Sequence, residues 1–347
     1  MSAVGSVSGK VLDIEILSNY CRLCEKEDND EHECHLNHSG SSNAMEPAGA
    51  VRIFSRSIET RGLKYTDYLG DGDTSAYRAV CQSKPYGEDG VIAKRECIGH
   101  IQKRVGSRMR KLKASMKGKI LSDGKTIGGA GRLTDKVIDR CQNYYGMAIR
   151  ANTNSIVDMQ TNIMSSLYHV ASSSDRPNHD LCPAGPESWC GWQRNPDSYI
   201  HKAGLPECIV NLLEPIYDDL SSTELLSKCL HGQTHNSNES FHHVVWARVT
   251  KEQWVSRKVL EQAAYSAVGQ YNDGAVTIIH ILERLGISAR HFTVEGSIRK
   301  DRIRLADSKR TSSDTQKLRR QRIRGIRKGH IDKQVQEEFP SYEKGAF

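Results

Sequence analysis

The stretch KYTDYLGDGDTSAYRAV (Lys64–Val80) passes from a strand pattern to a helix pattern through a turn of glycine and aspartate. Its first six residues have the aromatic and β-branched content of a strand, and Thr74 can cap a helix that begins at Ser75. The next strand and helix are predicted over Val91–Cys97 and the basic run His100–Lys119. A strand–helix–strand–helix order indicates an α/β sheet.

The rest of the chain extends this pattern on both sides. Val11–Leu17 alternates apolar and polar residues, which predicts a half-buried strand. Glu46–Glu59 has helical apolar spacing, with Pro47 near the expected helix start. The later part is predicted to be mostly helical over Leu133–Ser227 with an interruption at Arg176–Pro196, then helical again over Glu239–Val249 and Ser256–Leu285.

Composition limits the class of protein. The chain has 347 residues, of which 37% are hydrophobic and 26% charged, so it can bury a sizeable core. It has no apolar run long enough to cross a membrane, and its first ten residues lack the pattern of a secretory signal. Ten cysteines in such a chain are expected to be thiols or metal ligands rather than disulfides.

Positive charge is concentrated in two segments. Arg299–Lys328 carries a net charge of +10 and Lys94–Lys119 a net charge of +9, whereas the remaining residues sum to −12. Concentrated positive charge favours a polyanionic partner, most often nucleic acid, because phosphate contacts release counterions. The alternative is a solvated helix face and a disordered tail.

Several residues have the chemistry of metal ligands. Asp71 and Asp73 stand on a glycine-rich turn at a predicted strand end, where two carboxylates can hold Mg²⁺, although an ordinary turn has the same composition. Cys97 and His100 have zinc-ligand spacing but make only half a site. Glu239, taken alone, is better explained as part of a capping box that begins at Asn236.

Two cysteine-rich segments are stronger zinc candidates. Four residues in two close pairs match a structural zinc site with three cysteines and one histidine: Cys21, Cys24, Cys34 and His38, with His32 and His35 as alternatives for the fourth ligand. The second segment contains Cys182 and Cys190, with His169, His179 and His201 nearby. It predicts either a second metal site or a loop anchored by tryptophan and stiffened by proline.

Five motifs stand in a specific order: YLGDGDTSAYRAV, ECIGHIQKRVGSRMRKLK, GGAGRLTDKVIDRCQNYYGMAIR, CPAGPESWCGW and HGQTHNSNESFHHVVW. This series resembles the Mutator-like transposase domain of animal transposable elements over roughly residues 9–290. The resemblance implies an RNase H-like α/β fold of the DDE transposases, in which three carboxylates hold Mg²⁺ or Mn²⁺ for DNA cleavage and strand transfer.

The resemblance also implies roles for individual residues. Asp71 matches the second catalytic acid, with Asp73 as a weaker candidate, and Glu239 matches the third, although His242 replaces the family's usual asparagine. Cys97 and His100 match a Cys-x2-His element after the fifth strand. The expected organisation is a partial core with a zinc insert near residues 18–40 (residues 1–117), a helical insertion (118–235), the last core helices (236–290) and a basic tail (291–347).

The chain departs from the family pattern at the first catalytic aspartate. In the family that residue belongs to an Asp-Gly-Thr/Ser-Trp motif on the first strand, and no Asp-Gly-x-Trp occurs in this sequence. The resemblance therefore implies a core that is incomplete at the N-terminus, with the strand at Val11–Leu17 lacking its partner. Asp13 falls in that third strand and is not expected to substitute. With Asp71 and Glu239 alone, we expect very weak metal binding and no catalysis.

Three functions remain open from the sequence. The chain is a transposase-derived protein, a non-catalytic zinc-containing DNA-binding protein derived from a transposon, or a decayed copy without function. For the first two, duplex DNA at transposon ends is the expected partner, along with a nuclear location and a homo-oligomer; no membrane or small-molecule substrate is expected. The expected DNA contacts are Lys103, Arg104, Arg108, Arg110, Lys111, Lys113, Arg319, Arg320, Arg322 and Arg324.

Overall fold

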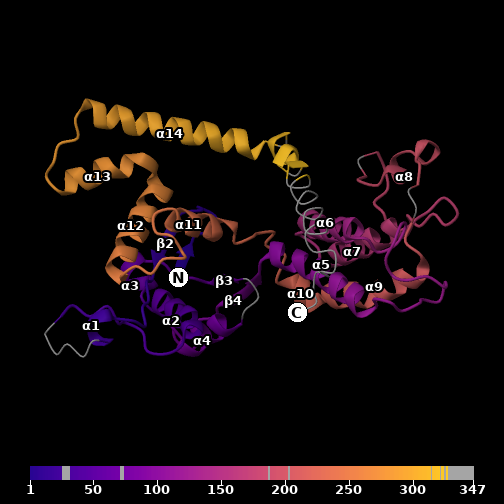
Figure 1. Cartoon of the computed structure of the whole chain (residues 1–347), viewed down its shortest axis with the longest axis horizontal. Helices are drawn as coiled ribbons and strands as arrows, with labels where there is room; N and C mark the ends of the chain where they lie inside the picture. The colour runs from indigo at the N-terminus through magenta and orange to yellow at the C-terminus, as the bar shows by residue number, and fades with distance from the viewer. Residues whose placement is uncertain are drawn as a thin grey trace, which may run out of the picture. The chain divides into compact units, whose positions relative to one another are not determined.

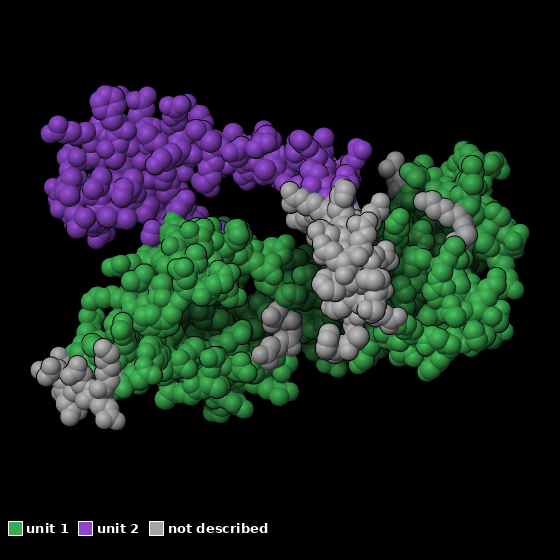
Figure 2. All heavy atoms as spheres, viewed as in Figure 1, with its two compact units in different colours: residues 1–263 green, residues 264–347 purple. Residues whose placement is uncertain are grey.

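The computed structural model describes residues 1–25, 32–70, 74–186, 188–201, 204–313, 315–320, 322–323 and 326. The chain divides into two compact units, residues 1–263 and residues 264–347 (Figure 2). Figure 1 labels the helices and strands along the chain. The boundaries expected from the sequence, after residues 117, 235 and 290, stay a prediction. Among the described residues, no helix is long and apolar enough to cross a membrane.

The first sheet of unit 1 is an antiparallel pair. Strand β2 (Val11–Ile14) forms over the first half of the predicted strand, and it pairs with β1 (Ser2–Val4), which the sequence did not predict. The expectation that this strand lacks a partner is therefore wrong. The chain reverses between Gly5 and Lys10, where the Gly5 N–H donates to the Lys10 carbonyl, so the partner comes from the adjacent segment.

The second sheet is a parallel pair that follows the predicted order. Strand β3 (Asp67–Gly70) pairs in parallel with β4 (Ala93–Glu96), and α4 (Ser75–Ser83) connects them. Helices α2 (Ser42–Ser55) and α3 (Ser57–Arg61) complete this region. Its core is formed by Ala50, Ile53, Phe54, Tyr68, Ala76, Val80 and Ile92.

Two details of the sequence prediction are wrong in this region, and the RNase H-like core stays untested. Helix α2 begins at Ser42, so Pro47 lies inside the helix rather than near its start. Thr74 is the N-cap of α4, but its side chain accepts no hydrogen bond there. In the part of the chain that the structure describes, the four strands form two separate two-stranded sheets. The mixed α/β class is confirmed, while an RNase H-like core stays a prediction.

A second core joins the last helix before residue 117 to the helices of the predicted insertion. It is built by α5 (Ile98–Ser115), α6 (Asp135–Ala151), α7 (Ile156–Ala171), α9 (Glu207–Leu220) and α10 (Thr223–Ser227). The Thr134 side chain caps α6 by accepting a hydrogen bond from the Val137 N–H, and the Ser155 side chain caps α7 by accepting one from the Asp158 N–H. The buried Tyr145 hydroxyl donates to the Leu220 carbonyl at 2.6 Å and so ties α6 to the end of α9.

The remaining elements agree with the helical prediction. The interruption in the insertion contains only short helices, α8 (Gly191–Arg194) and η1 (Pro196–Ser198). Beyond it lie α11 (Asn236–Trp246), α12 (Arg257–Asp273), η2 (Gly274–Val276), α13 (Thr277–Arg284) and α14 (His291–Ser312), and α1 (Arg22–Glu25) is a single turn near the N-terminus. In unit 2 the Asp301 carboxylate on α14 accepts a hydrogen bond from the Ala275 N–H of η2.

Candidate functional site

The carboxyl ends of β3 and β4 lie at one edge of their sheet. The register pairs Gly70 with Glu96, so both strands end at the same level, and the Cys97 N–H donates to the Gly70 carbonyl at 3.3 Å. In parallel α/β sheets this edge is where ligands bind. Asp71 and Asp73 follow β3 directly in the sequence but lie outside the described residues.

A distant segment runs along this edge and brings α11 to it. The Glu96 N–H donates to the Lys228 carbonyl at 3.0 Å, and the Ile98 N–H donates to the Gln233 carbonyl at 3.3 Å. The His231 ring nitrogen Nε2 lies 3.0 Å from the Glu96 carbonyl oxygen. These contacts fix residues more than 130 positions apart, and they place the start of α11 beside Cys97.

Three ligand-type side chains meet at this point. Cys97 and His100 at the start of α5 lie with His235, at the start of α11, so that one ligand atom from each is within 4.8 Å of the others. The rings of His100 and His235 have centroids 4.5 Å apart. Cys97 is buried and the two histidines are half-buried. The pair expected from the sequence therefore gains a third ligand-type residue.

Glu239 is attached to this cluster through His235. Its Oε1 atom lies 3.0 Å from His235 Nε2, and its side chain is 56% exposed. The capping-box explanation is wrong, because the N-cap is His235, Asn236 lies inside the helix, and no side chain caps it. The Glu239 carboxylate engages Nε2 of His235 and so holds the imidazole in one orientation. The other ring nitrogen, Nδ1, is buried and has no hydrogen-bond partner among the described residues, so it is the nitrogen available to a metal ion.

His235 could have been found from the sequence. It precedes Glu239 by four positions, a spacing that places two side chains on one helix face. His242, which replaces the family's usual asparagine, has a partner near the N-terminus: its Nε2 lies 2.9 Å from Ser2 Oγ. Ser2 Oγ also donates to the Asn238 side chain, so β1 is fastened to α11.

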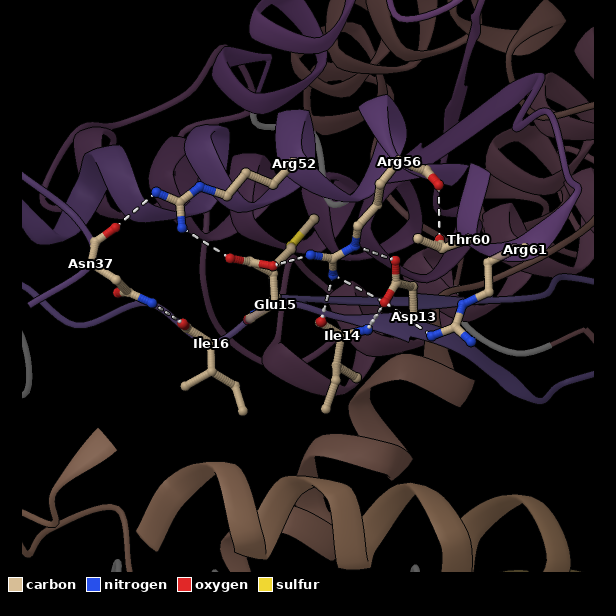
Figure 3. Close-up of polar contacts among 10 residues, drawn as sticks. Asp13, Ile14, Glu15, Ile16, Asn37, Arg52, Arg56, Thr60 and Arg61 are labelled. Carbon is tan, nitrogen blue, oxygen red and sulfur yellow. Dashed lines mark hydrogen bonds and ion pairs between the residues drawn. The ribbon is translucent and has the colours of Figure 1, made fainter. Parts of the chain in front are cut away.

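The Asp13 carboxylate is bound by two arginine side chains, Arg56 and Arg61 (Figure 3). Arg56 Nε donates to Oδ2 at 2.8 Å and Nη2 donates to Oδ1 at 3.0 Å, while Arg61 lies 3.4 Å from Oδ1. Burial alone would raise the pKa of Asp13, but Arg56, the Ile14 N–H and Arg61 together more than offset this and lower it. Both carboxylate oxygens are engaged, which agrees with the expectation that Asp13 is no catalytic substitute.

The same arginine joins a larger network that holds β2 against α2. Arg56 Nη1 donates to Glu15 Oε2, and Nη2 also donates to the Ile14 carbonyl at 2.7 Å. Arg52 donates to Glu15 Oε1 at 2.9 Å and to the Asn37 carbonyl at 2.7 Å (Figure 3). The network therefore links the first sheet, the helix α2 and the last part of the zinc insert.

The zinc insert brings four ligand-type side chains together, namely Cys21, Cys24, His32 and Cys34. His32 Nε2 lies 3.6 Å from the Cys21 sulfur and 3.4 Å from the Cys24 sulfur, and the sulfurs of Cys24 and Cys34 are 3.4 Å apart. Three thiols and one imidazole with these separations fit a four-coordinate zinc ion.

The environment of the sulfurs also suits a cation. Backbone N–H groups of Cys24 and His35 lower the pKa of Cys21 to about 5, which favours its thiolate. Hydrogen bonding with the Cys34 and Cys21 sulfurs raises the pKa of Cys24 to about 11. Crowded sulfurs cannot all ionise without a positive charge among them, and a bound metal cation would supply that charge.

The fourth ligand position differs from the first choice made from the sequence. His32, one of the alternatives, lies with the cysteines, whereas His38 does not. The Asn37 side chain is bonded to the Ile16 carbonyl and the Ser18 N–H, and the backbone N–H of His38 also donates to Ser18. This attachment turns the chain after Cys34 and buries His38 beside Gly40.

The second cysteine-rich segment also assembles. Cys182 and Cys190 lie with His169 and His179, with one ligand atom of each within 4.8 Å of the others. His201 is not in this group, because it contacts the outer nitrogen of His179 at 3.0 Å. Trp189 and Trp192 pack against His169 and His179, so the two predictions for this segment, a metal site and a loop anchored by tryptophan, are compatible.

The basic residues expected to bind DNA divide into two sets. Four of the six on α5 form ion pairs within the protein: Arg104 with Glu96, Arg108 with Asp219, Arg110 with Asp139, and Lys113 with Asp135. Lys103 and Lys111 are exposed and have no acidic partner among the described residues. In unit 2, Arg319, Arg320 and Arg322 are exposed, and Arg324 lies outside the described residues.

This division predicts unequal effects on DNA binding. Replacing Lys103 and Lys111 together by alanine should reduce the slope of log affinity against log salt by about 1.8, at about 0.9 per phosphate contact. Replacing Arg108 and Arg110 by alanine should change the slope much less, since Asp219 and Asp139 already neutralise them. Fluorescence anisotropy with a labelled duplex at several salt concentrations measures both, and equal losses would contradict the division.

Comparison with known proteins gives one match. A family model described as "Mutator-like transposase" matches residues 1–190. That range contains the zinc insert, both sheets and the Cys97–His100 pair, and it ends at Cys190; His235 and Glu239 lie beyond it. No curated protein and no solved structure matches the chain.

Proposed function

The chain belongs to the Mutator-like transposase family, and from that premise we propose that it binds duplex DNA at the edge formed by β3, β4 and α11. Membership in a transposase family implies DNA binding and the use of a divalent metal ion. The proposal assigns the acidic positions of this edge to Asp71 and Glu239, with Asp73 as a weaker third, and Mg²⁺ or Mn²⁺ as the ion.

One observation carries this proposal. Cys97, His100, His235 and Glu239 come from segments more than 130 residues apart and converge where β3 ends, immediately before Asp71. Convergence of titratable side chains from distant segments at the carboxyl edge of parallel strands is typical of a functional site. The bond between Glu239 and His235 gives this carboxylate a positioning role that is compatible with metal binding.

We further propose that the 347-residue chain, assayed by itself, binds DNA without cutting it. Two-metal cleavage needs carboxylates on both sides of the ions, and the sequence contains no Asp-Gly-x-Trp motif to supply the first of them. The non-catalytic alternative is compatible with the cysteine and histidine group of the insert, because a structural metal site needs no catalytic carboxylates.

The test combines binding and cleavage. Purified protein is titrated against a labelled duplex at several salt concentrations, and supercoiled plasmid is incubated with it in Mg²⁺ or Mn²⁺. We expect salt-dependent binding and no nicking. Absence of binding at low salt would refute the DNA-binding proposal, whereas metal-dependent nicking lost in Asp71→Ala would refute the non-catalytic one. Asp89→Ala, which changes an exposed carboxylate on the loop before β4, is the matched control.

Location and assembly are part of the same proposal. We propose a nuclear location, supported by the basic residues of Arg299–Lys328, since Lys/Arg-rich clusters serve as nuclear localisation signals. A fluorescent fusion without residues 299–347 should then lose nuclear accumulation, and it should also show a smaller salt slope for DNA binding. A homo-oligomer on paired DNA ends stays a prediction.

A further inference from the structure

Four ligand-type side chains surround one point in the helical part of unit 1. His169 lies on α7, and His179, Cys182 and Cys190 belong to the segment between α7 and α8. His179 and both cysteines are buried, and His169 is half-buried. The family assignment gives this group no role, and it lies apart from the edge of β3 and β4.

The separations of the four atoms match those around a tetrahedral ion. The two Nδ1 atoms of His169 and His179 are 3.2 Å apart. The Cys182 sulfur lies 3.8 Å from each of them, and the Cys190 sulfur lies 3.6 and 3.4 Å from them. Zinc bonds of the usual length place two nitrogens about 3.3 Å apart and a nitrogen and a sulfur about 3.6 Å apart.

Neighbouring groups orient the ligand atoms. The outer nitrogen of His179, Nε2, lies 2.9 Å from Ser172 Oγ and 3.0 Å from His201 Nε2, so its Nδ1 lone pair is left for the centre of the group. The Ser165 hydroxyl donates to the Cys182 sulfur at 3.4 Å. Contacts of this kind hold histidine and cysteine ligands in position in metal sites.

Aromatic rings shield the group. Trp192 stacks on His179 with centroids 5.3 Å apart and an interplanar angle of 15°, and Trp189 lies edge-on to His169 at 4.9 Å. An apolar wall around a cation requires that its ligands balance its charge. Two thiolates and two neutral imidazoles bound to Zn²⁺ give no net charge, so this donor set suits a buried zinc ion.

We propose that His169, His179, Cys182 and Cys190 bind a structural Zn²⁺ ion that fastens the segment after α7 to that helix. Four protein ligands fill a tetrahedral ion and leave no position for a substrate, so the site is structural rather than catalytic. Among its described residues, the stretch from 172 to 190 contains no helix or strand. Its path therefore depends on side-chain attachments, of which the metal is the strongest.

Zinc content of purified protein tests the site. In a Cys24→Ser background, which removes the insert's contribution, Cys190→Ser should lower the zinc content by one further equivalent per chain. Cys208→Ser, a half-buried thiol on α9 outside the group, should leave it unchanged. Co²⁺ in place of Zn²⁺ should give the intense d–d bands of a tetrahedral site, and these bands should vanish in Cys190→Ser. An unchanged metal content in a folded Cys190→Ser variant would overturn the proposal.

A second measurement uses the unaltered chain and needs no folded variant. Cys182 and Cys190 should resist alkylation in the native protein, and a chelator should make both reactive as zinc is released, which peptide mass spectrometry can map. Alkylation that is the same with and without chelator would overturn the proposal, as would a Cys182–Cys190 disulfide in protein purified without oxidant. Neither outcome bears on DNA binding at the β3–β4 edge.

Discussion

Replacing Cys24 by serine is expected to remove one equivalent of zinc and to open the segment from residue 21 to residue 34. Structural zinc sites contribute about 10–16 kcal/mol of apparent binding free energy near neutral pH, so losing one thiolate has a large local effect. The only helix among the described residues of this segment is the single turn α1. We therefore expect rapid trypsin cleavage within it, measured by mass spectrometry of timed digests.

Two histidine variants sharpen this prediction. His32→Ala should lose the zinc ion, because His32 Nε2 lies beside the sulfurs of Cys21 and Cys24, whereas His38→Ala should retain it. Cys81→Ser, a half-buried thiol on α4, serves as the control for a cysteine outside all three groups. Loss of zinc in His38→Ala, together with retention of zinc in His32→Ala, would show that His38 is the ligand.

Replacing Arg56 by methionine is expected to destabilise unit 1 by about 3 kcal/mol, the lower end of the range for breaking a buried ion pair. The lower end applies because Arg56 is itself 32% exposed, although the Asp13 side chain is only 4% exposed. The change leaves the Asp13 carboxylate buried with the Ile14 N–H at 2.8 Å and the weaker Arg61 contact, neither of which replaces the two bonds from Arg56. Urea unfolding followed by circular dichroism measures the shift in midpoint.

An exposed ion pair provides the control. Arg95→Met breaks the ion pair between Arg95 and Asp67, whose side chains are 37% and 47% exposed. It should lower the free energy of unfolding by less than about 1 kcal/mol. Equal destabilisation by the two variants would mean that the buried network contributes nothing beyond a surface contact.

The effect of Arg56→Met should also depend on pH. The folded protein lowers the pKa of Asp13, so the stability that this group contributes is fully present above the unfolded value of about 3.9 and is lost as the pH falls through the folded value. In the variant, loss of the guanidinium makes the pKa of Asp13 higher than it is in the unaltered protein. The difference in stability between the two proteins should therefore shrink as the pH is lowered from 7 toward 3.

Local features of this protein were predictable because they depend on short sequence separations. The strand at Val11, the strands before and after α4, and the helices of the insertion follow from hydrophobic spacing and turn residues. The cysteine group of the insert follows from Cys21, Cys24 and Cys34, which are separated by two and by nine intervening residues. The strand β1 was missed because three small residues beside a glycine-rich turn carry little pattern of their own.

The order of the elements, the ligand types, the two basic segments and the family resemblance follow from the sequence alone. Which of these residues meet depends on the tertiary fold. His235 joins Cys97 and His100 because backbone hydrogen bonds align residues 228–233 with the end of β4, and no local pattern encodes such pairing. His32 lies with the cysteines of the insert, and His38 does not, because Asn37 turns the chain. Four basic residues of α5 form ion pairs because acidic residues of α6, α9 and β4 pack beside them. Spacing fixes contacts within a turn or two, whereas contacts between distant segments are fixed by packing.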